Sequence, residues 1–260
     1  MKTLEGHHAF VTGGGSGIGR AIALRLAREG VRVAISGRRL DKLDETVDLA
    51  EEQGYQMQAH TLDVCDATAV EACVERVASE LGGLSLLINN AGMGGPNAMD
   101  GRPGDPADRW REVLSVNLDG MFYATRAALR HLRAGGSVIN ISSVLGKFGV
   151  PGYTAYCTSK HGVVGFTRSL AWELAPREIR VNAICPGWVE TDMAREGMED
   201  MGRNLGISFE EARRQALAQV PLGRILEPDE IAGLCVWLAG PEARGMTGQA
   251  INLSGGSSMW

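Results

Sequence analysis

Short apolar runs alternate with longer segments of helical periodicity along nearly the whole chain. The runs expected to be strands lie at residues 7–12, 31–36, 55–64, 84–89, 137–142, 179–185 and 248–254. Between them, residues 17–30, 39–54 and 67–82 place apolar side chains three and four positions apart, as amphipathic helices do. Strands that are apolar throughout, each followed by a helix, favour a parallel sheet covered on both faces. The alternation therefore predicts an α/β fold with one doubly wound sheet of seven parallel strands.

The chain shows no linker, internal repeat or break in composition over its 260 residues. We therefore expect residues 1–260 to form a single domain. Two stretches interrupt the alternation. Residues 92–108 are dense in Gly, Pro and Asp and are expected to form a loop, while residues 190–222 hold helix-compatible pieces between the sixth and seventh strands. Long excursions in a compact domain are usually functional, so we expect the second stretch to serve the substrate.

Charge and cysteine usage exclude several classes of protein. Lys and Arg number 26 against 31 Asp and Glu, so the net charge is −5, and no long basic run is present to bind nucleic acid. No stretch approaches the length of about 18 apolar residues typical of a membrane span, and the N-terminus lacks the apolar core of a signal peptide. We therefore expect a cytoplasmic protein with no membrane partner. Cys65, Cys73, Cys157, Cys185 and Cys235 form no CxxC pair and the histidines show no ligand spacing, which favours reduced thiols and no metal site.

The stretch VTGGGSGIGRAIA, residues 11–23, follows the first expected strand and opens the first expected helix. Glycines at this place let the chain turn tightly and let backbone N–H groups approach a pyrophosphate at the helix N-terminus. The informative spacing is Gly13, Gly17 and Gly19. Glycine also serves turns that bind nothing, but a position between a strand and a helix favours a dinucleotide cofactor.

The residues after the second strand bear on the choice between NAD and NADP. An acidic side chain there binds the ribose hydroxyls of NAD, whereas arginine accommodates the 2′-phosphate of NADP. This chain has Gly37 where the acid is expected, followed by Arg38 and Arg39. Because a guanidinium suits phosphate, we expect NADP(H) to be preferred. The alternative is a solvated basic turn and use of NAD(H).

Tyr156 and Lys160 stand four residues apart in YCTSK, on one face of an expected helix. A free tyrosine keeps its proton until a pH of about 10, and a nearby cation lowers that pKa. The pair is therefore a candidate for acid–base catalysis, although such pairs also occur by chance on helix surfaces.

Six motifs in order along the chain resemble those of the short-chain dehydrogenase/reductase family. They are TGGGSGIG at 12–19, NNAG at 89–92, the asparagine of SVNLDG at 115–120, NISS at 140–143, YCTSK at 156–160 and CPGWVET at 185–191. The resemblance runs nearly from end to end. It implies a Rossmann-like single domain and an NAD(P)-dependent oxidoreductase that interconverts a ketone and a secondary alcohol by hydride transfer.

The resemblance also implies catalytic roles for four residues. Tyr156 would exchange a proton with the substrate oxygen, while Lys160 would lower the pKa of Tyr156 and bind the ribose next to the nicotinamide. Ser143 would donate a hydrogen bond to the same oxygen, and Asn117 would hold a water that links Lys160 to bulk solvent. The set is chemically consistent, because hydride transfer to a ketone builds negative charge on oxygen, which both hydroxyl groups stabilise.

The same resemblance implies cofactor and substrate contacts. The expected cofactor contacts are Gly13, Gly15, Ser16, Gly17, Ile18, Gly19, Arg38, Arg39, Asp63, Val64, Asn89, Ala91, Gly92, Tyr156, Lys160, Pro186, Gly187, Val189 and Thr191. Asn90 is expected to support the strands, and Asp63 and Thr191 have the alternative of capping the next helix. The expected substrate contacts are Met93, Ser143, Leu145, Phe148, Tyr153, Trp188 and Met193. Their apolar character favours a mid-sized, largely apolar ketone or secondary alcohol.

Three functions stay open from the sequence. The first is an oxidoreductase of a discrete ketone and alcohol pair. A 3-oxoacyl-[acyl-carrier-protein] reductase would do the same chemistry on a tethered substrate, but the arginines near the site look scattered. A nucleotide-binding relative without turnover is disfavoured, because no catalytic residue is missing. Apolar stripes in residues 153–175 and 227–240, together with the resemblance, imply a homotetramer.

Overall fold

The computed structural model describes residues 4–97, 99 and 106–259. Its strands form one sheet in the order β3-β2-β1-β4-β5-β6-β7, and every neighbouring pair is parallel. The strands are β1 His8–Thr12, β2 Arg32–Gly37, β3 Met57–Thr61, β4 Leu84–Asn89, β5 Leu132–Ile141, β6 Arg180–Pro186 and β7 Ala250–Leu253. The predicted α/β fold with seven parallel strands is confirmed.

Two strand boundaries differ from the prediction by more than two residues. β3 ends at Thr61 rather than at residue 64, because the chain turns at Asp63. β5 begins at Leu132, ahead of the predicted residue 137. Gly135, with a φ of +78°, lies in this early part of β5 and interrupts the apolar pattern that the prediction relied on.

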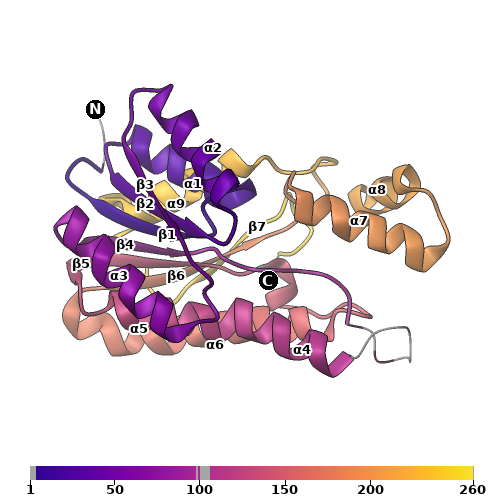
Figure 1. Ribbon diagram of the computed structural model, residues 1–260. Coiled ribbons are helices and arrows are strands. Elements are labelled where there is room, and N and C mark those ends of the chain that lie inside the picture. Colours follow the sequence, from indigo (N-terminus) through magenta and orange to yellow (C-terminus); the bar gives the residue numbers. More distant parts are fainter. Residues whose placement is uncertain (1–3, 98, 100–105, 260) are drawn as a thin grey trace.

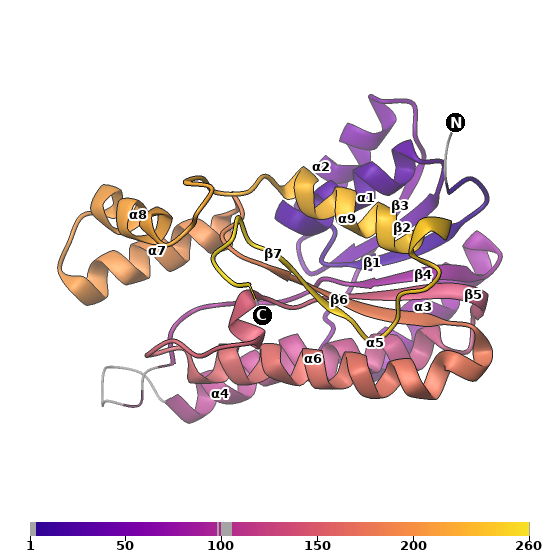
Figure 2. The same ribbon diagram turned by 180° about the vertical axis from the view of Figure 1, so that it is seen from behind.

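Helices cover both faces of the sheet. α1, α2 and α9 lie on one face, and α3, α5 and α6 lie on the other (Figures 1 and 2). The described helices are α1 Gly17–Arg28, α2 Leu40–Glu51, α3 Ala67–Leu81, α4 Pro106–Leu114, α5 Gly120–Ala128, α6 Thr154–Leu174, α7 Asp192–Leu205, α8 Phe209–Ala218 and α9 Pro228–Ala239. None of these combines the length and the hydropathy that a membrane span requires.

Side chains of the central strands are buried on both faces of the sheet. Val11 and Ile35 pack in the core beneath α1 and α9, while Phe10 and Ala34 pack in the core beneath α3 and α5, and all four are 0% exposed. Successive side chains along a strand point to opposite faces. The strands therefore read as continuous apolar runs rather than as an alternating pattern.

The excursion at residues 190–222 forms a hairpin of α7 and α8 that projects beyond the sheet (Figure 1). It has a small core of its own, made by Met198, Ala216 and Ile225, with Trp188 packed against it. We call α7 and α8 the lid. The helix-compatible pieces noted in the sequence therefore do form helices.

The predicted loop at residues 92–108 is only partly a loop. Residues 92–97 have no regular secondary structure, but α4 begins at Pro106, so the last predicted loop residues are helical. Proline is common in the first turn of a helix because no hydrogen-bond partner is needed there for its missing N–H. Most of the stretch between lies outside the described residues.

Candidate active site

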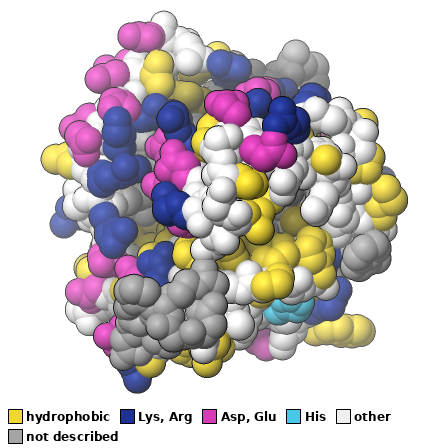
Figure 3. Space-filling view, turned by 90° about the vertical axis from the view of Figure 1, so that its right-hand side faces the viewer, with side chains coloured by type: hydrophobic (Ala, Val, Ile, Leu, Met, Phe, Trp, Pro, Cys, Tyr) yellow, Lys and Arg dark blue, Asp and Glu magenta, His cyan; other side chains and the backbone are white. Residues whose placement is uncertain are grey.

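A cavity of about 860 Å³ opens at the carboxyl ends of the strands, where the strand order reverses between β1 and β4. Ligands of doubly wound sheets bind at this point. Figure 3 looks onto this side of the molecule and shows hydrophobic side chains gathered in the hollow, with Lys and Arg side chains along one flank. The cavity is therefore the candidate active site.

The cavity brings together nearly all of the predicted site residues. Its wall includes Gly13, Gly15, Ser16, Gly17, Ile18, Gly19, Arg38, Arg39, Asp63, Val64, Ala91, Gly92, Met93, Ser143, Leu145, Phe148, Tyr153, Tyr156, Lys160, Pro186, Gly187, Trp188, Val189, Thr191 and Met193. Two predicted residues, Asn89 and Asn117, do not line it.

Asn89 does not reach the cavity, whereas Asn90 does so in addition to its expected role of supporting the strands. The Asn89 side chain is buried beside β5, where its Nδ2 donates to Oδ1 of Asn140 at 2.8 Å. Asn90 lines the cavity instead, and its Nδ2 donates to the carbonyl oxygens of Thr12 (3.1 Å) and Gly13 (3.0 Å). Neighbouring residues at a strand end point to opposite sides, so the NNAG motif alone did not reveal which asparagine faces the cavity.

The glycine turn between β1 and α1 leaves no room for side chains. Gly13 has a φ of +69°, and a Cβ at Gly19 would lie 2.1 Å from the carbonyl oxygen of Gly13. α1 begins at Gly17, and within the described residues no side chain caps its first N–H groups. Such uncapped N–H groups at a helix N-terminus are suited to bind phosphate. The turn therefore fits the pyrophosphate of a dinucleotide.

Arg38 and Arg39 lie at the cavity beside this turn. The Arg39 guanidinium donates to Oγ of Ser16 at 3.2 Å. In the part of the chain that the structure describes, neither arginine forms an ion pair, whereas nearby Arg20 pairs with Glu45. The two guanidinium groups are thus suited to a further phosphate group next to the turn.

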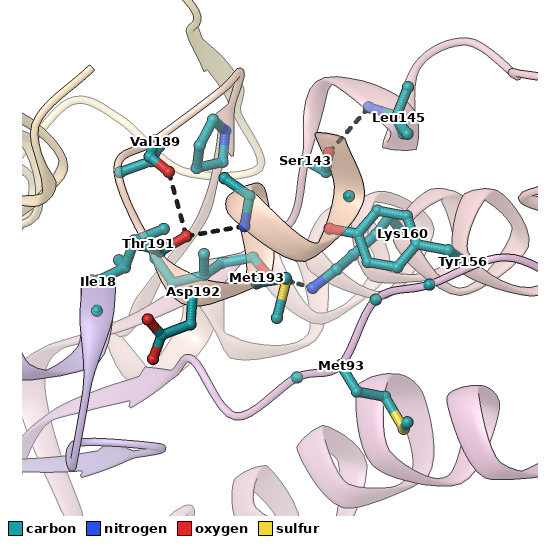
Figure 4. Close-up of a pocket in the computed structure, with 18 of the residues that line it drawn as sticks. Ile18, Met93, Ser143, Leu145, Tyr156, Lys160, Val189, Thr191, Asp192 and Met193 are labelled. Atoms are coloured by element: carbon teal, nitrogen blue, oxygen red, sulfur yellow. Dashed lines mark hydrogen bonds between the residues drawn. The ribbon is translucent and has the colours of Figure 1, made fainter. Parts of the chain in front are cut away.

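Ser143 follows β5 and Tyr156 lies on α6, so these two elements meet at the cavity (Figure 4). Both side chains line the cavity, and the Ser143 hydroxyl lies near enough to the phenol of Tyr156 to influence its pKa. Burial raises the pKa of Tyr156 to about 12, and the Ser143 hydroxyl acts in the opposite direction. The phenol therefore carries its proton at neutral pH.

The pKa of Tyr156 lies above that of a free tyrosine despite the nearby Lys160, so the expected lowering of this pKa by Lys160 stays a prediction. The Nζ of Lys160 donates to the carbonyl oxygen of Ile141 at 3.0 Å and lies 5.7 Å from the centre of the Tyr156 ring. Burial lowers the pKa of Lys160 itself to about 8. Loss of solvation is therefore the largest influence on the pKa of each of the two groups in the protein without its cofactor.

Asn117 lies in a π-helical turn, Ser115–Asp119, that joins α4 to α5. Its Oδ1 accepts a hydrogen bond from the N–H of Met93 at 2.8 Å, and its Nδ2 donates to the carbonyl oxygen of Met93 at 2.9 Å and to Oγ of Ser159 at 3.0 Å. Asn117 therefore ties the segment after β4 to α6. Its expected water-holding role stays a prediction.

The two residues with a capping alternative behave differently. Asp63 lines the cavity and accepts a hydrogen bond from the N–H of Cys65 at 3.0 Å, while Asp66 caps α3. Thr191 does cap α7, because its Oγ1 accepts from the N–H of Ala194 at 3.2 Å. The capping alternative is therefore wrong for Asp63 and right for Thr191, which lines the cavity as well.

The substrate side of the cavity lies between the lid and the segment after β4. Met193 on α7 faces Gly94, where a Cβ would come within 3.5 Å of the methionine sulfur. Figure 4 shows Met193 beside Tyr156 and Lys160. Several wall residues that the sequence analysis did not single out are on the lid, namely Asp192, Ala194, Gly197, Met201, Asn204, Leu205 and Ala216, and Gln219 and Val220 follow directly after it. The spacing of four between Gly197 and Met201, on one helix face, is the signal that could have found them.

Known proteins are similar to this chain in sequence and in fold. A family model described as enoyl-(acyl carrier protein) reductase matches residues 13–258. The chain is 41% identical, over 261 aligned positions, to a Streptomyces coelicolor protein provisionally named a ketoacyl reductase, with 98% of each chain covered. It is 38% identical to the 3-oxoacyl-[acyl-carrier-protein] reductase FabG of Thermotoga maritima, with 97% of this chain and 98% of the other covered.

A solved structure gives the same result for the fold. A crystal structure of a tryptophan-substituted actinorhodin polyketide ketoreductase with NADPH matches this chain with a TM-score of 0.92 at 40% identity, covering 100% of this chain and 99% of the other. The chain belongs to the short-chain dehydrogenase/reductase family. It is an oxidoreductase, and the resemblance of its six motifs to this family is confirmed. As in the family, the site serves interconversion of a ketone and a secondary alcohol by hydride transfer.

Proposed function

We propose that the chain is an NADP(H)-preferring reductase that converts the β-keto group of an acyl or polyketide chain into a secondary alcohol. The observation that carries the proposal is the placement of the Ser143 hydroxyl and a protonated Tyr156 phenol in one cavity with the glycine turn. Both hydroxyl groups can donate to one carbonyl oxygen, while the turn holds a dinucleotide. The ketoacyl reductases among the relatives support this substrate class.

The protein contributes to the reaction through the hydroxyl groups of Ser143 and Tyr156 and through one proton that Tyr156 donates. Bound NADPH supplies the hydride to the carbonyl carbon. As negative charge develops on the oxygen, Ser143 and Tyr156 donate hydrogen bonds to it, and Tyr156 transfers its proton to complete the alcohol. Tyr156 is the third residue of α6, so the positive end of the helix dipole stabilises the phenolate that results. A protonated Lys160 adds to this stabilisation.

The protonation state of Tyr156 supports reduction as the working direction. A general acid must carry its proton before the reaction, and a pKa of about 12 ensures this at neutral pH. Alcohol oxidation needs the phenolate as a base. Its rate should therefore rise steadily with pH across the neutral range, while the reduction rate stays nearly flat.

The preference for NADPH rests on Arg38 and Arg39. We expect the double variant Arg38→Ala, Arg39→Ala to bind NADPH about 10- to 100-fold more weakly, because two cationic donors to the 2′-phosphate are lost. NADH binding should stay within about two-fold, as it should for both cofactors in the lid control Arg203→Ala. Equal binding of NADPH and NADH by the unchanged enzyme would mean that the arginines form only a solvated turn.

The substrate class is tested with a panel of thioesters and simple ketones. A β-ketoacyl thioester should be reduced rapidly, a small charged keto acid poorly because the wall is mostly apolar, and an enoyl thioester not at all because it lacks the ketone oxygen at the reacting position. Faster turnover of the carrier-bound than of the free thioester would support the tethered substrate. Turnover of discrete apolar ketones alone would favour the other function left open by the sequence.

We further propose a cytoplasmic homotetramer in which each chain works as one catalytic domain. Large apolar side chains are exposed on α5, α6 and α9, namely Phe122 (46%), Trp172 (85%) and Trp237 (40%), which suits contacts between subunits. The five cysteines are free, which fits a reducing compartment. Native mass spectrometry tests the assembly, and a monomer mass alone would overturn it.

A further inference from the structure

The segment after β4, residues 93–97, passes alongside the catalytic tyrosine. Figure 4 shows the chain at Met93 running beside Tyr156 and Lys160. A Cβ at Gly94 would lie 4.0 Å from the ring of Tyr156 and 3.4 Å from the side chain of Met193. The segment therefore forms the wall of the cavity between the phenol and the lid, where a substrate must lie.

Two elements hold the beginning of this wall segment. Asn117 forms hydrogen bonds with both the N–H and the carbonyl oxygen of Met93. The guanidinium of Arg109 on α4 donates to the carbonyl oxygen of Gly94. These bonds account for the position of residues 93 and 94 but leave open what holds the end of the segment.

Asn97 joins the end of the segment to the start of α6. Its side chain is 3% exposed, and its Oδ1 accepts hydrogen bonds from the N–H of Ala155 at 3.2 Å and from the hydroxyl of Thr154. Its own N–H donates to the carbonyl oxygen of Gly152 at 2.7 Å. The segment is thus bonded to residues on both sides of the point where α6 begins.

α6 needs this bond because its own capping position is occupied by Tyr153. An N-cap side chain normally accepts a hydrogen bond from the second or third N–H of the helix. Tyr153 makes no such bond within the described residues, and it lines the cavity. Asn97 bonds the second N–H of α6, that of Ala155, and so does the work of a cap from 58 residues earlier in the chain.

We propose that Asn97 is a positioning residue that caps the catalytic helix from a distance and so fixes the cavity wall relative to the Tyr156 phenol. The inference rests on the proposed role of Tyr156 as proton donor. Tyr156 follows Ala155 directly, so a shift of the first turn of α6 moves the phenol relative to both Ser143 and the substrate. A misplacement of about 1 Å at a reacting group costs up to about 100-fold in rate.

The test compares Asn97→Ala with Asn97→Asp, which keeps the acceptor oxygen, and with Asp66→Ala as a matched control. Asp66 Oδ1 caps α3 by accepting from the N–H groups of Thr68 (3.0 Å) and Ala69 (2.9 Å), and it does not line the cavity. We expect Asn97→Ala to lower kcat for ketone reduction by about 10- to 100-fold with NADPH affinity within about two-fold. Asn97→Asp should recover most of kcat, and Asp66→Ala should lower the melting temperature alone.

Equal kcat in Asn97→Ala and Asp66→Ala, at similar losses of melting temperature, would overturn the inference and leave Asn97 as an ordinary cap. Hydrogen exchange gives a readout that needs no turnover. Asn97→Ala should speed amide exchange in residues 154–158, and Thr154→Val should speed it in residues 93–97. If the unchanged enzyme reduces no ketone but each variant speeds amide exchange in the other segment, the proposed function is wrong while the link between the cavity wall and α6 is supported. If neither variant changes amide exchange in the other segment, the proposed link between residues 93–97 and α6 is wrong.

Discussion

The glycine turn and the lid line the same cavity, but they are built in opposite ways. At the turn, a Cβ on Gly19 would lie 2.1 Å from a backbone oxygen, and the adjoining side chain of Val11 is 0% exposed. On the lid, Met193 is 42% exposed and Leu205 is 55% exposed. The turn is determined by backbone contacts, whereas the lid presents side chains.

This difference indicates that the residues of the glycine turn tolerate little substitution, whereas the side chains of the lid can vary. A backbone contact at van der Waals distance tolerates no added atom, since the surrounding sheet is close-packed. An exposed side chain on a projecting hairpin can change without disturbing that sheet. We infer that the turn and the Ser143–Tyr156 pair determine the chemistry and that the lid determines which substrate fits.

The largest effect should come from removing one hydroxyl at the reacting centre. Ser143→Ala removes a hydrogen-bond donor to the developing oxyanion and should lower kcat by about 100- to 1000-fold. Ser208→Ala removes a lid hydroxyl, whose Oγ accepts from the N–H of Glu211 at 3.2 Å. We expect that control to lose some stability with kcat nearly unchanged. Similar kcat values for the two variants in steady-state assays would contradict the claim that Ser143 takes part in the chemical step and the lid does not.

A methyl group added to a glycine should be far more costly in the turn than on the lid. Gly19→Ala forces atoms together at the turn, and we expect a loss of about 3 kcal/mol in unfolding free energy together with about 100-fold weaker NADPH binding. Gly197→Ala places its Cβ 3.4 Å from the ring of Trp188, an ordinary contact. Its stability should stay within about 1 kcal/mol of the unchanged enzyme, because alanine also favours a helix. Denaturant unfolding and NADPH titration measure both, and normal NADPH binding by Gly19→Ala would contradict the account of the turn.

Lys160 should make the cofactor-free enzyme less stable at neutral pH than at alkaline pH. Burial lowers its pKa from 10.5 to about 8, so between these values the unfolded chain keeps a proton that the folded protein has lost. The free energy of unfolding therefore rises with pH across this window. Lys160→Met removes the buried charge and should stabilise the protein by about 3 kcal/mol near neutral pH, with the gain lost as the pH rises to about 10.5. Urea unfolding at several pH values tests this, and a gain that does not change with pH would contradict it.

The smallest effect is expected on the lid itself. Met193→Ala opens space opposite Gly94 and should change KM for long-chain substrates by about three- to ten-fold. Its stability should stay within about 0.5 kcal/mol, because Met193 is partly exposed. Leu205→Ala, farther along α7, serves as control and should change KM less. A large loss of kcat in Met193→Ala would show that the lid takes part in the chemistry.

Most of the fold could be predicted because the burial of both sheet faces is visible in the sequence. Residues such as Val11 and Phe10 point to opposite cores, so each strand appears as an unbroken apolar run. The early start of β5 was missed because Gly135 breaks that run. The motifs predicted which residues gather at the cavity, since parallel strands end at one edge.

What could not be predicted depends on direction and distance in space. The sequence does not show that Asn90 rather than Asn89 faces the cavity, because that choice depends on how the chain leaves β4. It shows Lys160 near Tyr156 but not the burial that raises the phenol pKa. The cap that Asn97 provides to α6 joins residues 58 positions apart, and no local pattern marks it.

The most direct test of the central claim is the rate of NADPH oxidation with a β-ketoacyl thioester by the unchanged enzyme and by Tyr156→Phe. We expect rapid oxidation by the unchanged enzyme and a rate about 1000-fold lower in the variant, with NADPH affinity unchanged, because only the proton donor is lost. A Tyr156→Phe enzyme that keeps its rate within about ten-fold would contradict the claim that this phenol delivers the proton.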